Sequence, residues 1–404
     1  MRAGLFLLLS VLLLASCSKH EQQPPEHSSY CYSFDGSRTI SDIGAPTAAT
    51  ALTLPISTAP TTAPLPLSGQ DTNTFVIAQG TTITIGNNHS AHIFARSSDS
   101  SIITELLADS ASLYAIHLNG HIDCFSFEGK QQWSTSIAAM PKPGSVLSSN
   151  AIVMMSDSAI TAIDKAKGSM LWSYHSKLYP VTLALDKKRI ILALSGNDAT
   201  GTDSILTMGF DGKVQSSFAL EHGRITSNVA LLGENKFAIG YLSAATDNND
   251  PKQPMLYTGS IADNGAIKIQ WQRPVEYLVT SIAANSNFIL ACGFRETAGD
   301  LVSGIDAFGH NDSALLWKRR FSYPVVAITT ISPRFAYLPF TFTTQATVPT
   351  KTIATILDLS DGSTTSEVPI PGAEAGMVQG AAMPVEGCIV YADRAKPTLY
   401  FLKP

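Results

Sequence analysis

The sequence predicts an all-β protein, an eight-bladed β-propeller built from four-stranded antiparallel sheets. Three observations predict it. From Thr74 onward no segment has the periodicity of an amphipathic helix. Short apolar runs alternate with Gly, Asn, Asp, Ser and Pro clusters, as strands alternate with turns. Units of four such strands recur every roughly 35 to 54 residues, a period typical of propeller blades. Seven blades is the alternative count.

The first 16 residues have the features of a secretory signal peptide. Arg2 supplies a positive charge, and Leu5 to Leu14 is an apolar run interrupted by Ser10. The run is too short to span a bilayer comfortably. The sequence Leu-Ala-Ser-Cys that ends at Cys17 resembles the bacterial lipobox. The resemblance implies cleavage before Cys17, acylation of that residue with chains such as palmitate, and a membrane anchor made of lipid.

The lipid anchor also predicts where the protein lies. The uncharged Ser18 after the acylated cysteine resembles the signal for release to the outer membrane. We therefore expect a protein that is anchored to the outer membrane, on the periplasmic side. Exposure at the cell surface is the alternative.

Three segments are expected between the anchor and the main domain. Residues 17–29 are polar and contain proline, as a flexible tether would. Residues 30–43 have strand character and are expected to close the last blade, which otherwise has three strands. Residues 44–69 are rich in Thr, Ala and Pro and are expected to form an irregular connector. The propeller itself is then expected over residues 70–404.

The composition excludes several classes of protein. Hydrophobic residues make up 45% of the chain and charged residues 15%, so the chain has enough apolar side chains for a folded core. The formal net charge is −5, and no basic run is long enough to indicate a nucleic-acid partner. The cysteines are scattered, and Cys124, Cys292 and Cys388 each lie within an apolar run, which predicts buried thiols rather than a disulfide framework.

The turns of the repeat are marked by residues that tolerate positive φ. Asn119-Gly120 separates two apolar runs, and Asp211-Gly212, Asn264-Gly265 and Asp361-Gly362 separate other pairs of strands. Each unit also contains a strand that often ends in Trp after such a turn. The expected sheets span, approximately, residues 70–97, 101–136, 144–175, 179–220, 225–273, 278–320, 325–370 and 376–402.

The best copy of the repeat motif runs from Ala162 through Asp164 and Gly168 to Trp172. Partial copies contain the three other tryptophans of the chain, Trp133, Trp271 and Trp317. The motif resembles the repeat of the PQQ-like, or quinoprotein-type, propellers. That resemblance implies eight blades, a tryptophan that packs between neighbouring sheets, and an Asp and a Gly that shape the turn. A lipoprotein of this length that is all propeller also resembles the BamB family of the outer-membrane β-barrel assembly machinery.

The sequence contains no catalytic or metal-binding set. The resemblance to alcohol-oxidising quinoproteins would imply a vicinal cysteine pair, which is absent here. The pairs His117/His121 and His89/His92 have spacings that could bind a metal, but no third ligand is evident, and the Asn119-Gly120 turn places the first pair on opposite arms of a hairpin. The loop around Asp247 to Asp250 lacks the spacing of an EF-hand. We therefore expect no metal and no cofactor.

These observations favour a lipid-anchored, non-catalytic scaffold that contacts protein partners of the outer-membrane assembly machinery. Two alternatives remain open at this point, a periplasmic quinoprotein-type enzyme and a surface-exposed propeller for ligand binding or adhesion. A fold alone cannot decide between them, because the same propeller supports unrelated functions.

Overall fold

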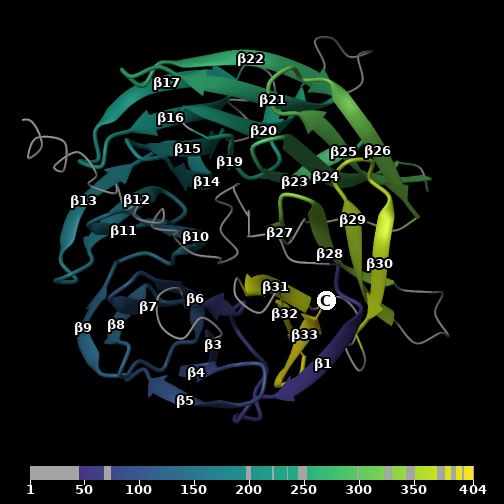
Figure 1. Cartoon of the computed structure of the whole chain (residues 1–404). Coiled ribbons are helices and arrows are strands. Elements are labelled where there is room, and N and C mark those ends of the chain that lie inside the picture. Colours follow the sequence, from purple (N-terminus) through teal and green to yellow (C-terminus); the bar gives the residue numbers. More distant parts are fainter. Residues whose placement is uncertain are drawn as a thin grey trace, which may run out of the picture.

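In a computed structural model, eight antiparallel sheets form a closed ring around a central axis (Figure 1). This confirms the prediction of an eight-bladed propeller. The structure describes residues 45–67, 74–196, 202–220, 223–233, 235–243, 253–297, 300–322, 325, 330–342, 351–370, 378–383, 388–393 and 395–403. Within these ranges no helix is long and apolar enough to cross a membrane.

The first four blades follow one another along the chain, and within each blade the strands run in chain order from the innermost to the outermost. Blade 1 contains β2 (Leu65–Pro66), β3 (Phe75–Gln79), β4 (Thr82–Gly86) and β5 (Ala91–Arg96). Blade 2 contains β6 (Ile103–Ala108), β7 (Ser112–His117), β8 (His121–Ser126) and β9 (Gln131–Ser136). Blade 3 contains β10 (Lys142–Leu147), β11 (Ala151–Met155), β12 (Ala159–Asp164) and β13 (Met170–His175). Blade 4 contains β14 (Tyr179–Leu185), β15 (Ile190–Ser195), β16 (Asp203–Met208) and β17 (Val214–Leu220).

The last four blades complete the ring. Blade 5 contains β18 (Gly223–Ile225), β19 (Ala230–Leu231), β20 (Lys236–Ser243), β21 (Pro254–Ile261) and β22 (Ile267–Pro274), with β18 and β19 both paired to β20. Blade 6 contains β23 (Leu278–Ala284), β24 (Phe288–Thr297), β25 (Asp300–Gly309) and β26 (Leu315–Phe321). Blade 7 contains β27 (Thr330–Ile331), β28 (Phe335–Phe342), β29 (Lys351–Asp358) and β30 (Thr364–Pro369). Blade 8 contains β31 (Val378–Met383), β32 (Cys388–Asp393), β33 (Thr398–Lys403) and β1 (Ala48–Thr53).

The position of a strand within its blade explains its residue pattern. Second strands such as β7 and β11 are buried along their whole length, because a neighbouring blade covers each face of the sheet. Outermost strands such as β9 and β13 alternate between exposed and half-buried residues. The apolar runs of the sequence are therefore the second and third strands, and the alternating runs are the outer ones.

The hydrophobic core consists of clusters that lie between neighbouring sheets. The cluster between blades 3 and 4 contains Val153 and Ile160 from one sheet and Leu192 and Leu206 from the next. Equivalent clusters of described residues fill every junction of the ring. Cys124, Cys292 and Cys388 lie buried in three of them outside any disulfide, as predicted, and burial raises the pKa of the Cys124 thiol to about 11. Stability therefore depends on packing between blades.

The ring is closed by an N-terminal strand, but not by the one that the sequence predicted. β1 pairs antiparallel with β33, with Ala48 opposite Lys403 and Thr53 opposite Thr398. The expected closing strand, residues 30–43, lies outside the described residues. β1 instead occupies a proline-free stretch between Pro46 and Pro55, so every residue of it can donate to the ladder. The expectation that residues 44–69 form an irregular connector was wrong at this stretch.

The same expectation was also wrong near the end of the connector. Leu65 and Pro66 form the innermost strand of blade 1 and pair with Val76 and Phe75. Proline is compatible with this position because the innermost strand is an edge of its sheet, where one side of the strand makes no ladder hydrogen bonds. Blade 1 therefore begins at β2, a few residues before the predicted propeller boundary.

Candidate functional site

The repeat motif forms the outer hairpin of blade 3. The Asp164 carboxylate accepts hydrogen bonds from the backbone N–H groups of Ala166 and Lys167, at 2.8 and 2.9 Å. Gly168 has a φ of 69° and donates its N–H to the Asp164 carbonyl. Ala162 lies directly opposite Trp172 on the next strand. The carboxylate is thus used in shaping the turn, which is a structural role.

Three of the four tryptophans extend from one blade onto the turn of the next. The Trp172 indole N–H donates to the Phe210 carbonyl at 2.8 Å, and a Cβ on Gly212 would lie only 2.6 Å from the ring. Trp133 donates to the carbonyl of Lys165 and lies against Gly168 in the same way. Trp317 does so with the carbonyl of Leu359 and with Gly362. The glycines are required both for positive φ and for the close approach of the ring.

Trp271 makes a different contact with its neighbouring blade. The turn that it faces has Ser313, with a φ of 59°, where the other turns have glycine. Its ring centroid lies 6.1 Å from that of Phe308, and no hydrogen bond of its indole N–H is found among the described residues. Unlike the glycines, Ser313 has a side chain, which is buried and accepts a hydrogen bond from Arg273. Sequence reasoning grouped all four tryptophans and missed this difference.

The junction between blades 4 and 5 contains no tryptophan among its core residues, and a buried arginine crosses it beside the apolar cluster. Arg189, only 1% exposed, donates from Nη1 to the Ala262 carbonyl at 2.6 Å and from Nη2 to Asn235 Oδ1 at 3.1 Å. Its Nε lies 3.3 Å from Asp186 Oδ2, so the buried charge is compensated within its own blade. Arg189 therefore links blade 4 to two turns of blade 5.

The histidines His117 and His121 meet at Asp123, which the sequence analysis did not single out. Their rings lie on opposite arms of the β7–β8 hairpin with centroids 5.3 Å apart. His117 Nδ1 lies 2.7 Å from the Ser101 carbonyl oxygen, and Nε2 lies 3.2 Å from Asp123 Oδ2. Both ring nitrogens face oxygen acceptors, an arrangement that favours the doubly protonated imidazolium form of His117. His121 and Asp123 are two positions apart in the sequence, so a strand places them on the same face, and this spacing could have indicated that they lie together.

The charges of this buried group support one another. Burial lowers the pKa of His117, but hydrogen bonds to Asp123 and to the Ser101 carbonyl, with the negative charges of Asp123 and Asp99, raise it above its usual value. Burial raises the pKa of Asp123, but hydrogen bonds from His117, Ser97 and His121 bring it below its usual value. The result is a buried ion pair that connects the loop before β6 to the loop after β7.

No metal-binding group of three His, Cys, Asp or Glu side chains is found among the described residues. His117 uses both of its ring nitrogens in hydrogen bonds. His89 and His92 are exposed near the β4–β5 turn. The Asp247–Asp250 loop lies outside the described residues, as do Cys17 and the signal peptide.

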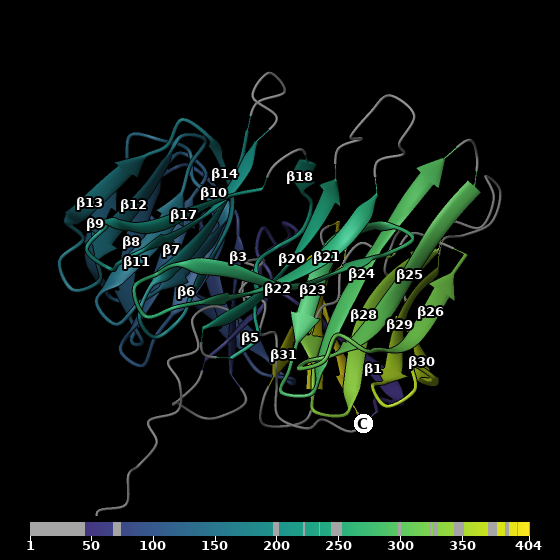
Figure 2. The same cartoon turned by 90° about the horizontal axis from the view of Figure 1, so that it is seen from above.

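One face of the ring carries a row of exposed apolar side chains across blades 2, 3 and 4, which we call the apolar band. These side chains lie where the innermost strands begin or where the second strands end, a face seen along the upper edge in Figure 2. Met140 is 59% exposed and Tyr179 is 52% exposed, although both are large and apolar. The apolar band consists of Ile102, Leu118, Met140, Tyr179 and Val181.

Hydrogen bonds link the segments that carry the members of the apolar band. The Leu118 N–H donates to the Ile102 carbonyl at 3.0 Å. The Gly120 carbonyl accepts from Ile137 in the loop that leads to Met140. Lys142, two residues further, donates from Nζ to the carbonyl of Pro180, which lies between Tyr179 and Val181. The segments of the three blades are therefore connected at this face, and groups of exposed apolar side chains are typical of protein–protein contacts.

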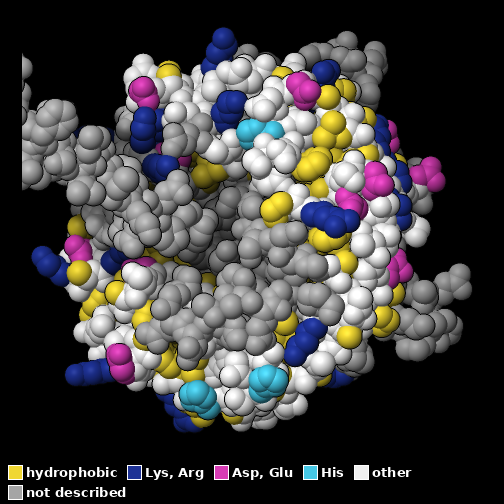
Figure 3. Space-filling view, in the orientation of Figure 1, with side chains coloured by type: hydrophobic (Ala, Val, Ile, Leu, Met, Phe, Trp, Pro, Cys, Tyr) yellow, Lys and Arg dark blue, Asp and Glu magenta, His cyan; other side chains and the backbone are white. Residues whose placement is uncertain are grey.

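The same face is charged at blade 6. Glu276 accepts from Lys318 Nζ at 2.8 Å and from Arg320 Nη2 at 3.0 Å, and these hydrogen bonds hold the pKa of its carboxyl below the usual range. On the opposite face, seen in Figure 3, basic, acidic and apolar side chains are all scattered around the rim. The apolar band therefore differs from blade 6 on its own face, where charged side chains pair.

Comparisons with known proteins identify the fold. No family model and no curated protein matches the chain. The structure is similar to BamB from Moraxella catarrhalis, with a TM-score of 0.58 and 13% identity, over 89% of this chain and 99% of that one. It is similar to the C-terminal WD40 domain of Sif2, with a TM-score of 0.57 and 10% identity, over 89% and 100%. It is also similar to the quinohemoprotein alcohol dehydrogenase from Comamonas testosteroni, with a TM-score of 0.59 and 8% identity, over 91% and 78%.

At these identities the likeness establishes the propeller fold alone. The three similar structures include a dehydrogenase beside two propellers whose names describe no enzyme. Function therefore has to be argued from the surface of this chain.

Proposed function

We propose that the protein is a lipid-anchored, non-catalytic scaffold, a BamB-like accessory that contacts protein partners during outer-membrane protein assembly. The observation that carries the proposal is the apolar band, five exposed apolar side chains on one face of blades 2 to 4. Exposing such side chains to water is unfavourable, and a partner that covers them would recover the free energy of burial.

The anchor gives the scaffold its place in the cell. Cleavage before Cys17 and acylation of its thiol and new α-amine attach the chain to the outer membrane, and several acyl chains give stable attachment. The polar residues 17–29, the expected tether, would then hold the ring near the membrane surface. Replacing Cys17 by Ser should abolish the incorporation of labelled palmitate and release the protein from the membrane fraction. Unchanged membrane association of this variant would contradict the lipid anchor.

Similarity to BamB supports the identity of the partner, and the position of the apolar band supports the mode of contact. A photo-crosslinking residue at Met140 tests both in the acylated protein in its native membrane. Leu316 is the matched control, because it is an exposed apolar residue on the outer strand β26, away from the band. We expect the pore protein of the barrel-assembly machinery to crosslink from position 140 and not from position 316.

Other outcomes of this experiment would favour a different function. Crosslinks from position 140 to redox proteins would favour the quinoprotein-type enzyme. Crosslinks only to host or extracellular proteins would favour a surface-exposed binding propeller. Equal crosslinking from both positions would contradict the apolar band as the contact surface.

A further inference from the structure

A cavity of about 360 Å³ lies at the junction of blades 5 and 6, apart from the apolar band. Its lining comes from the end of β22, from β25, and from the turn and strand that follow, with Arg273, Phe308, Ser313 and Leu315 among the lining residues. This volume is within the range of cavities that hold small ligands.

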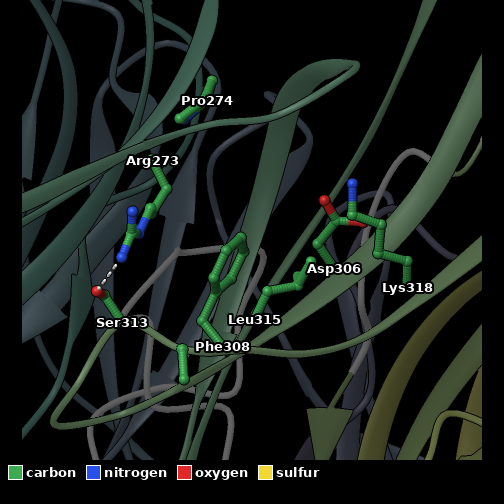
Figure 4. Close-up of a pocket in the computed structure, with 8 residues that line it drawn as sticks. Arg273, Pro274, Asp306, Phe308, Ser313, Leu315 and Lys318 are labelled. Carbon is green, nitrogen blue, oxygen red and sulfur yellow. Dashed lines mark hydrogen bonds between the residues drawn. The ribbon is translucent and has the colours of Figure 1, made fainter.

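The turn at Ser313 forms part of the cavity wall. Ser313 has a φ of 59°, whereas the turns that Trp133, Trp172 and Trp317 contact have glycine against the ring. The Ser313 hydroxyl accepts a hydrogen bond from Arg273 Nη2 at 3.1 Å. The guanidinium of Arg273 is thereby directed along the cavity wall (Figure 4).

The charges around the cavity leave one cation uncompensated. Asp306 pairs with Arg320 at 2.6 Å, and Glu276 pairs with both Lys318 and Arg320. These four charges balance one another. Arg273 has no carboxylate partner among the ion pairs of the described residues, and its remaining N–H groups can form a forked pair with an anion.

The centre of the cavity is apolar. Figure 4 shows the Phe308 ring and Leu315 between Arg273 at one end and the Asp306–Lys318 group at the other. Leu315 is 46% exposed, so an apolar group lying on it would remove its surface from water. An inorganic anion would use only the Arg273 end of this arrangement. A cation beside an apolar wall matches a carboxylate attached to an apolar body.

We propose that this cavity binds a monocarboxylate with an apolar body, with the carboxylate on Arg273 and the apolar body on Phe308 and Leu315. Such a group is found in free small acids and at the carboxyl terminus of a polypeptide that ends in an apolar residue. The proposal does not depend on the scaffold function, because the cavity lies on a different blade pair from the apolar band.

Titration calorimetry with 3-phenylpropanoate on the mature protein tests the proposal. We expect a Kd of about 1 mM or tighter, and at least about tenfold weaker binding of the uncharged 3-phenylpropanamide. Arg273→Gln should weaken binding of the acid to a similar extent. Arg319→Gln is the matched control, because Arg319 lies on β26 but donates to Thr364 of blade 7, and this variant should bind as the wild type does.

A second variant tests the apolar wall without disturbing the core. Leu315→Asp, at an exposed position, should abolish binding because it places a negative charge beside the ligand. Absence of binding to the wild type, equal binding of acid and amide, or unchanged binding to the Arg273 variant would each overturn the proposal. A peptide with a free carboxyl-terminal leucine, compared with its amide and with the free acid, identifies the source. Tighter binding of the peptide indicates a chain terminus, and tighter binding of the small acid indicates a free metabolite.

Discussion

Two neighbouring junctions of the ring solve the same packing problem with different chemistry. Between blades 3 and 4, Trp172 lies on Gly212 and donates to a backbone carbonyl. Between blades 4 and 5 that tryptophan position, opposite Thr207, is taken by Ser216, and the buried guanidinium of Arg189 reaches across to blade 5. Thr207 adds a hydrogen bond to the Gly265 carbonyl at 2.8 Å. The comparison shows that either a tryptophan or a buried arginine can link a blade to a turn of the next one.

Removing the tryptophan should have the largest effect on stability. Trp172→Ala deletes a large side chain that packs between two sheets, and it leaves a cavity beside Gly212. We expect the free energy of unfolding to fall by about 3 to 5 kcal/mol. Thermal or urea unfolding measures it, and an unchanged midpoint would show that the ring does not depend on this contact.

Removing the buried charge of Arg189, between blades 4 and 5, should lower the free energy of unfolding by less. Arg189→Met keeps most of the buried stem but leaves the Ala262 carbonyl, Asn235 and Asp186 without their cationic partner. We expect a loss of about 2 to 3 kcal/mol in the free energy of unfolding. The exposed Lys188, whose Nζ pairs with Asp263, is the matched control, and Lys188→Met should cost at most about 1 kcal/mol. Equal losses in the two variants would contradict a special role for the buried cation.

The glycine on which the tryptophan lies provides a smaller and more specific test. Gly212 and Gly80 both have positive φ, 78° and 66°, but an added Cβ would meet the Trp172 ring at 2.6 Å in the first case and nothing within 4 Å in the second. Gly80→Ala should therefore show only the backbone cost, and Gly212→Ala should cost about 1 to 2 kcal/mol more. Equal unfolding free energies for the two variants would mean that the indole ring of Trp172 can move away from the added Cβ without a loss of stability.

The ion pair of His117 in blade 2 should make stability depend on pH, unlike the tryptophan junctions. The folded-state pKa of His117 lies above its unfolded value of about 6.5, so its contribution is full below that pH and is lost as pH rises through the folded value. We expect the difference in unfolding free energy between wild type and His117→Gln to shrink over this range. Urea titrations at several pH values measure it.

The comparison with the variant separates His117 from other groups that titrate nearby. His121, Asp99 and Asp123 face the same site and are present in both proteins. Burial raises the pKa of Glu105 to about 7, so its ionisation also lowers stability as pH rises, but equally in wild type and variant. A difference that stays constant with pH would show that His117 is not charged in the fold.

Features set by neighbouring residues could be predicted from the sequence. Positive φ occurs at Gly120, Gly212, Gly265 and Gly362, the four turns that the sequence marked with Asn-Gly or Asp-Gly. Seven of the eight sheets also follow from the repeat, because each of them is formed by strands that are consecutive in the chain. Such turns depend on the conformational preferences of two residues, which the sequence states directly.

Features that depend on which surfaces meet could not be predicted. The pairing of β1 with β33 joins the two ends of the described chain, with Ala48 opposite Lys403. The Thr/Ala composition of β1 is weak evidence for a strand. The apolar band is made of single exposed residues on three blades, and none of them stands out in its own segment. The cavity is lined by residues of two blades, and one of them, Ser313, has positive φ at a turn where the neighbouring blades have glycine.

The sequence by itself therefore determined most of the strands and their turns and favoured eight blades over seven, because these features follow from local preferences and a repeated period. The tertiary structure alone decided which strand closes the ring, which junctions use Trp and which use Arg189, and where apolar and charged side chains gather. These features arise from contacts between residues far apart in the chain, and their energies depend on burial and distance, which a linear pattern does not contain.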